Sequence, residues 1–90
     1  MLFRSGTLTS GSITFNYGNY NFYVIIGRPS STASRASLVV PKIMLTTSAV
    51  SFQIADESNY KSFNLSYSGS TVTLSIQGGN GQVNRVFGIN

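Results

Sequence analysis

The chain offers very few side chains that can perform acid–base, nucleophilic or metal chemistry. It contains no His and no Cys, and its only two carboxylates, Asp56 and Glu57, are adjacent. Catalysis near neutral pH usually needs a base of matched pKa, a thiolate or a pair of facing carboxylates. Neighbouring residues on an extended strand point to opposite faces, so Asp56 and Glu57 cannot act together there. We interpret them as part of a solvated loop, with a catalytic carboxylate or a weak calcium site as the alternatives.

Serine and glycine motifs give no stronger signal for catalysis. No Ser lies in a Gly-x-Ser-x-Gly motif, and a Ser–Lys pair with Lys42 or Lys61 as base is an alternative that no spacing favours. The glycine-rich segment 78–81 is followed by neither Lys-Ser nor a predicted helix, so it predicts a turn and not a phosphate-binding loop. We therefore expect a protein that is not an enzyme and that needs no cofactor or metal.

The charge pattern argues against a dedicated nucleic-acid surface. The formal net charge is +4, but only 9% of the residues are charged and the six basic residues are scattered without a run. A small nucleic-acid-binding β-barrel is thus the least favoured of the functions considered. No apolar stretch approaches the roughly 20 residues of a membrane span, so we expect no membrane insertion. Residues 1–6 lack the basic and apolar segments of a signal peptide, which predicts synthesis in a host cytoplasm without a cleaved export signal.

The elements that must position any site are strands. Apolar and polar residues alternate with period two along most of the chain, and Gly or Ser interrupts every potential long helix. Residues 22–26 are apolar at every position, which predicts a strand in the middle of a sheet. We expect a single all-β domain over 1–90, a small antiparallel β-sandwich of about seven or eight short strands. Residues 61–68, 71–77 and 82–88 are expected to form a C-terminal three-strand meander, with turns at Gly69 and at 78–81.

Two polar connections flank the apolar strand and carry the candidate binding residues. Residues 16–21 form a turn rich in Tyr and Asn, and residues 28–36 form a long polar loop with two Arg. Tyr is enriched in binding surfaces, although Tyr17 and Tyr20 could equally cap the edge of the sheet. The two connections lie about 17 Å apart at opposite ends of one strand, so they form one site only if neighbouring subunits bring them together. The candidate binding residues are Tyr17, Asn19, Tyr20, Arg28 and Arg35.

Several segments resemble the small β-rich C-terminal tip domains of bacteriophage tail-fibre and related tail proteins. The opening strand pair with Gly6, Gly11 and Ile13 precedes an Asn-Tyr turn and the apolar strand at 22–26. The segments Arg35-Ala36-Ser37-Leu38-Val39-Val40-Pro41 and Phe87-Gly88-Ile89 match later parts of that pattern. The resemblance implies a virion protein, commonly a homotrimer, at the end of a fibre that contacts the host surface.

These observations leave three functions open. The first is a tail-associated module that recognises a bacterial surface glycan or protein as part of a fibre or tail tip, and that gains avidity from several copies. The second is a virion structural, decoration or assembly protein without a host ligand, and the third is the nucleic-acid-binding barrel. A chain of 90 residues without disulfides has a small core, so we expect a homo-oligomer, with a trimer favoured, alongside other virion tail proteins.

Overall fold

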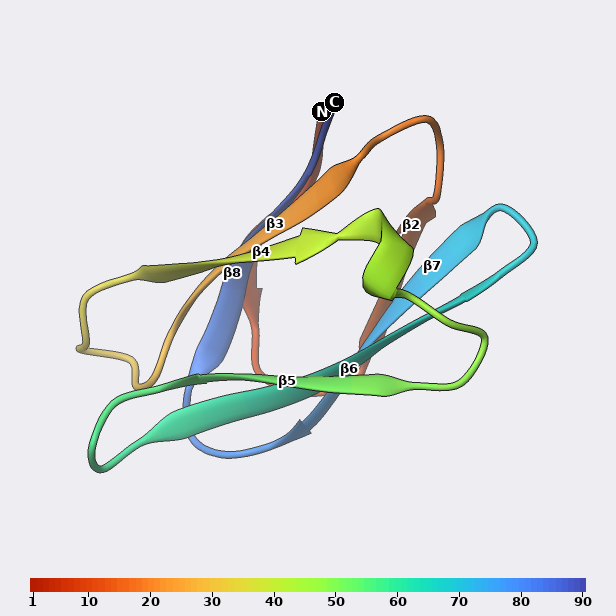
Figure 1. Cartoon of the computed structure of the whole chain (residues 1–90). Coiled ribbons are helices and arrows are strands. Elements are labelled where there is room, and N and C mark those ends of the chain that lie inside the picture. Colours follow the sequence, from red (N-terminus) through yellow and green to blue (C-terminus); the bar gives the residue numbers. More distant parts are fainter.

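Eight strands and one short 3-10 helix make up residues 1–90 of the computed structural model (Figure 1). The elements in chain order are β1 (Leu2–Leu8), β2 (Ser12–Asn16), β3 (Phe22–Arg28), β4 (Ala36–Pro41), the 3-10 helix η1 (Lys42–Met44), β5 (Val50–Ala55), β6 (Tyr60–Ser68), β7 (Thr71–Gly78) and β8 (Gln82–Ile89).

The strands form two antiparallel sheets of four. Sheet A has the order β1-β8-β3-β4, and sheet B has the order β2-β7-β6-β5. The two sheets lie one above the other, and the chain ends meet beside each other at one end of sheet A (Figure 1). The predicted all-β sandwich is confirmed, and β3, the strand that is apolar on both faces, lies inside its sheet as expected.

The core forms because alternate residues of each strand turn toward the opposite sheet. Tyr23 and Ile25 from sheet A, and Phe63, Leu65 and Leu74 from sheet B, are completely buried between the layers. Burying one such side chain stabilises the fold by roughly 1.5–3 kcal/mol. The core therefore lies along the middle of the sandwich, and the polar turns are at its two ends.

The predicted C-terminal meander is wrong in one pairing. The hairpin β6–β7 is present, and its turn residue Gly69 has the positive φ of 59° that a tight turn requires. The next strand, β8, does not pair with β7 but crosses to sheet A and lies between β1 and β3. The meander consists of β5, β6 and β7 instead. The alternation of apolar and polar residues predicts which side chains point inward. It does not predict that the chain passes from sheet B to sheet A in the connection that contains Gly79 (φ 92°), because β8 has the same alternation in either sheet.

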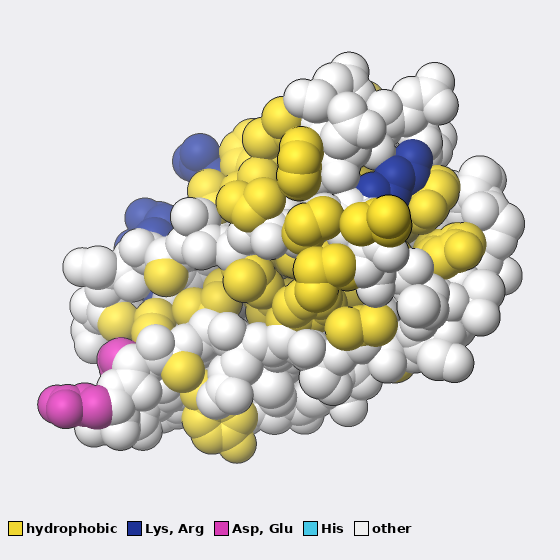
Figure 2. Space-filling model, viewed as in Figure 1, with side chains coloured by type: hydrophobic (Ala, Val, Ile, Leu, Met, Phe, Trp, Pro, Cys, Tyr) yellow, Lys and Arg dark blue, Asp and Glu magenta, His cyan; other side chains and the backbone are white.

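The charged residues are distributed unevenly between the two sheets. Asp56 begins the β5–β6 turn, where its carboxylate accepts hydrogen bonds from the backbone N–H groups of Ser58 (2.9 Å) and Asn59 (2.7 Å). These two bonds hold the pKa of Asp56 below its ordinary value. Both acidic residues thus lie at one tip of sheet B (Figure 2), whereas Arg4, Arg28 and Arg85 are on strands of sheet A. The chain contains no helix of the length and apolar character that crossing a membrane requires.

Candidate functional site

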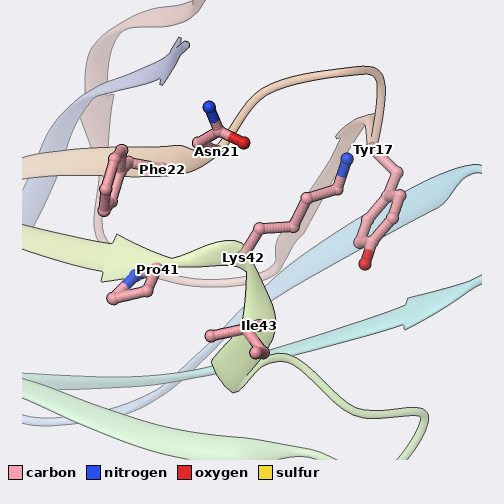
Figure 3. A pocket seen from close by; sticks show the side chains of 6 residues that line it. All are labelled: Tyr17, Asn21, Phe22, Pro41, Lys42 and Ile43. Atoms are coloured by element: carbon pink, nitrogen blue, oxygen red, sulfur yellow. The ribbon is translucent and has the colours of Figure 1, made fainter.

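An open recess of about 520 Å³ lies beside η1, where the β2–β3 turn meets the end of β4 (Figure 3). Three apolar side chains and three polar side chains line it, and they come from two stretches of the chain, residues 17–22 and 41–43. Ligand sites typically have volumes of roughly 300–1,000 Å³ and combine apolar walls with a few convergent polar groups. The recess fits that description. Its lining residues are Tyr17, Asn21, Phe22, Pro41, Lys42 and Ile43.

Backbone hydrogen bonds and strand pairing hold the wall of the recess in place. Phe22 and Pro41 are directly opposite each other where β3 and β4 pair. The N–H of Lys42 donates to the carbonyl of Asn21 at 2.9 Å, and the N–H of Asn21 donates to the carbonyl of Ile89 at 2.8 Å. The turn, the start of η1 and the chain end are therefore tied together, which makes the recess a largely preformed feature.

Lys42 and Tyr17 form the polar side of the recess. The Lys42 ammonium lies 3.9 Å from the centroid of the Tyr17 ring and also donates to the carbonyl of Gly18. The Tyr17 ring stacks on Tyr67 in sheet B, with centroids 4.8 Å apart and 27° between the planes. A cation over an aromatic face is attracted by the ring quadrupole, so each of these contacts limits the movement of the other. The Lys42 side chain reaches across the recess toward Tyr17 (Figure 3).

The polar groups of the recess have unused hydrogen-bonding capacity. An ammonium has three donors, and Lys42 uses one of them on a carbonyl of the chain. Asn21 is exposed, and its carboxamide makes no side-chain hydrogen bond within the chain. Phe22 is 40% exposed and Ile43 is 92% exposed, so two large apolar side chains also face solvent here. The recess can therefore offer an amide, a cation and an apolar platform to one ligand.

The five predicted binding residues do not form one cluster. Tyr17, Asn19 and Tyr20 lie in the β2–β3 turn, whereas Arg28 ends β3 and Arg35 precedes β4 at the other end of the sandwich. As expected from the length of β3, the two connections that carry these residues lie at opposite ends of the sandwich within one chain. Of the five residues, only Tyr17 lines the recess.

The remaining four predicted residues have different environments. Tyr20 is half-buried, with its ring edge-to-face against Phe3 at 5.4 Å, so it extends the core. Asn19 is exposed beside it. Arg28 donates to the carbonyl of Ser31 at 3.0 Å and so braces its own loop, and Arg35 is exposed.

Sequence reasoning missed most of the recess. Asn21, Phe22, Pro41 and Ile43 were not assigned to a site, and Lys42 was considered only as the base of a Ser–Lys pair. The available signals were the outward position of Phe22 in its strand and the Pro41-Lys42 strand ending. Neither signal indicates a site until the pairing of β3 with β4 places Phe22 opposite Pro41.

Lys61 is a second unusual polar group, and its contacts serve the fold and not the recess. It is 3% exposed and points into the end of the core, where its ammonium donates to the carbonyls of Thr9 (3.0 Å) and Gly79 (2.7 Å). Burial lowers the pKa of Lys61 from its ordinary value, because the charged form loses hydration. Its two bonds join the β1–β2 and β7–β8 connections. No group of three or more His, Cys, Asp or Glu side chains is placed to hold a metal ion.

Comparison with known proteins adds no relative: no family model, no curated protein and no solved structure matches this chain.

Proposed function

We propose that this protein is a non-enzymatic recognition module of a bacteriophage tail that binds a glycan of the host-cell surface through the recess beside η1. The observation that carries the proposal is the combination of Phe22, Asn21 and Lys42 around one preformed recess. The resemblance to tail-fibre tip domains supplies the biological setting, with the virion tail as the location of the assembled protein.

Three of the six lining side chains have a matching feature on a sugar. The exposed ring of Phe22 offers an apolar surface to the C–H face of a pyranose ring, and the Asn21 carboxamide can both donate to and accept from hydroxyl groups. The Lys42 ammonium favours a sugar that carries a carboxylate or a phosphate. A single shallow site of this kind binds weakly, so useful attachment depends on several copies acting together.

The test compares two exposed asparagines of the same turn. Fluorescently labelled protein is incubated with a panel of bacterial strains and with immobilised lipopolysaccharide and capsular polysaccharide. We expect Asn21→Ala to lower binding about tenfold, because a lost hydrogen bond in a ligand site costs about 1.4 kcal/mol. Asn19→Ala, which changes an exposed Asn outside the recess, should bind like the unchanged protein. Equal losses in both variants would assign binding to the turn as a whole, and no binding to any strain or glycan would contradict the proposal.

A second candidate function is that of a virion structural or assembly protein without a host ligand. The apolar outer surface of sheet A favours it, because large apolar side chains on that surface are left exposed to solvent. Tight binding to another virion protein together with failure on every bacterial strain would select this function.

A further inference from the structure

The outer faces of the two sheets have opposite chemical character. Across sheet B, the strand register places four polar side chains in one row: Ser12, Ser75, Asn64 and Ser51. Across sheet A, the corresponding register places four apolar side chains in one row: Leu2, Phe87, Val24 and Val39. A solvated face of an antiparallel sheet normally carries polar residues, as sheet B does. This part of sheet A therefore has the composition of a sheet that is covered on both sides.

The apolar surface extends along the strands on one side of that row. The neighbouring row on that side contains Ile89, Phe22 and Pro41, whereas the row on the other side is mostly polar and contains Ser5, Arg85, Ile26 and Ser37. Leu2 is 50% exposed, Val39 is 55% exposed and Ile89 is 46% exposed. Hydrophobic side chains gather over β3 and β4 in the upper part of Figure 2, with basic side chains at their border.

We propose that this outer face of sheet A binds the same face of a second copy of the chain, to give a two-fold symmetric dimer. This inference goes beyond the recognition function and does not depend on it. Two flat sheet faces pack well at a separation of about 10 Å, and a face that meets its own copy needs no other apolar partner. Phe22 and Pro41 belong to both surfaces, so the recess lies at the border of the contact.

The positions of the arginines decide how the two copies are oriented. Arg85 is in the row next to the apolar row, and Arg28 lies further along the same face. One possible two-fold axis lies in the contact plane, runs across the strands and passes over Phe87 and Val24. Arg85 is one row from this axis, and rows repeat about every 6.6 Å, so Arg85 and its equivalent in the second copy are about 13 Å apart along the strand direction. This distance exceeds the Debye length of roughly 8–10 Å, so repulsion is largely screened. An axis along the strands would place the arginine ends of both copies on the same side.

The size of the face sets the expected strength of the dimer. Four strands about 4.8 Å apart and about 23 Å long give a footprint of roughly 440 Å² per copy, so two copies bury about 900 Å² in total. Specific interfaces usually bury about 1,200–2,000 Å², and weak ones bury less. We therefore expect a reversible dimer with a dissociation constant of roughly 10–100 μM.

The test measures oligomeric state by sedimentation equilibrium from about 5 to 500 μM, a range that brackets the expected dissociation constant. Val39→Lys places a charge in the apolar row on the edge strand β4, and Gln53→Lys places the same charge on the outer face of the edge strand β5. The protein and the Gln53→Lys variant should dimerise alike, whereas Val39→Lys should weaken the dimer at least tenfold. Circular dichroism checks that both variants are folded.

A second measurement needs no variant. In a dilution series followed by two-dimensional NMR, the amide signals of Val24, Val39 and Phe87 should shift with concentration, and those of Thr14 and Thr73 on sheet B should not. A folded monomer at every concentration would overturn the proposal and would leave another protein or a lipid surface to cover this face. A trimer, equal effects of the two Lys variants, or shifts confined to sheet B would also overturn it.

Discussion

Replacing Tyr23 with Phe should produce a stability change that reverses sign at alkaline pH. Tyr23 is completely buried, and its hydroxyl donates to the carbonyl of Tyr17 at 2.6 Å. At pH 7, Tyr23→Phe removes this hydrogen bond and keeps the ring packed against Phe15, whose centroid is 5.5 Å away. The net loss of one buried hydrogen bond lowers the free energy of unfolding by about 1 kcal/mol.

The reversal follows from the titration of the same hydroxyl. Burial raises the pKa of Tyr23 from 10.0 to about 12, with smaller contributions from Tyr17 and Tyr20. A group whose pKa is raised in the folded state stabilises the protein fully below its unfolded pKa, and that contribution is lost as pH rises from 10 toward 12. The unfolded state releases the proton first, so the unchanged protein loses about 1.4 kcal/mol by pH 11 and about 2.3 kcal/mol by pH 12. The Phe variant has no such loss, and the two stabilities should cross near about pH 10.7.

The assay is urea unfolding followed by far-ultraviolet circular dichroism at pH 7, 9, 10, 11 and 11.5, for the protein and the Tyr23→Phe variant. Only the difference between the two free energies is interpreted, because the titration of other residues is common to both proteins. Tyr60→Phe removes the hydroxyl of a tyrosine that is 42% exposed, and it should change stability by less than about 0.5 kcal/mol at pH 7. A difference between the protein and Tyr23→Phe that stays constant from pH 7 to 11.5 would refute the reasoning.

Three further changes test the ends of the sandwich. Lys61→Met removes a buried ammonium whose pKa is lowered in the folded state, so the folded protein releases this proton at lower pH than the unfolded chain does. The free energy of unfolding of the unchanged protein, relative to that of the variant in the same urea assay, should therefore rise with pH up to about 10.5. A relative stability that falls over this range would contradict the assigned burial of that charge. Gly81→Ala places a Cβ 2.3 Å from the carbonyl oxygen of Arg28, and the required backbone shift should cost about 1–3 kcal/mol. Gly69→Ala meets no atom within 4 Å but has φ of 59°, so it should cost only about 1–2 kcal/mol. In a thermal melt, Gly81→Ala should therefore have a lower melting temperature than Gly69→Ala.

Much of the local structure could be predicted from the sequence. Alternation identified the strands and their inward residues, as in β6 and β7, because the side-chain period of a strand is fixed by backbone geometry. Turn chemistry was equally local, since Gly69 adopts the positive φ that was expected. Asp56 lies in the connection between β5 and β6, in line with its interpretation as part of a loop, and its carboxylate forms an Asx turn there. The apolar run at 22–26 correctly indicated an interior strand, although it did not indicate that one of its faces is open to solvent.

The binding site was not predictable in the same way. Tyr17 was named from its residue type, but four of its five neighbours in the recess come from β3, β4 and η1. Tyr20 was named for the same reason and instead packs on Phe3. A Tyr in a turn has the same local sequence signal in both cases, because only the pairing of distant strands decides whether its ring meets the core or a recess.

The sequence by itself determined that this chain is a β-sandwich with little catalytic equipment, since composition and a two-residue period are local properties of the polymer. The tertiary structure alone decided that β8 joins sheet A, that Lys61 is buried at the end of the core, and that one outer face is polar and the other apolar. The physical reason is that sheet membership depends on which long-range pairing buries the most apolar surface and satisfies the backbone. Alternation is the same whichever sheet a strand joins.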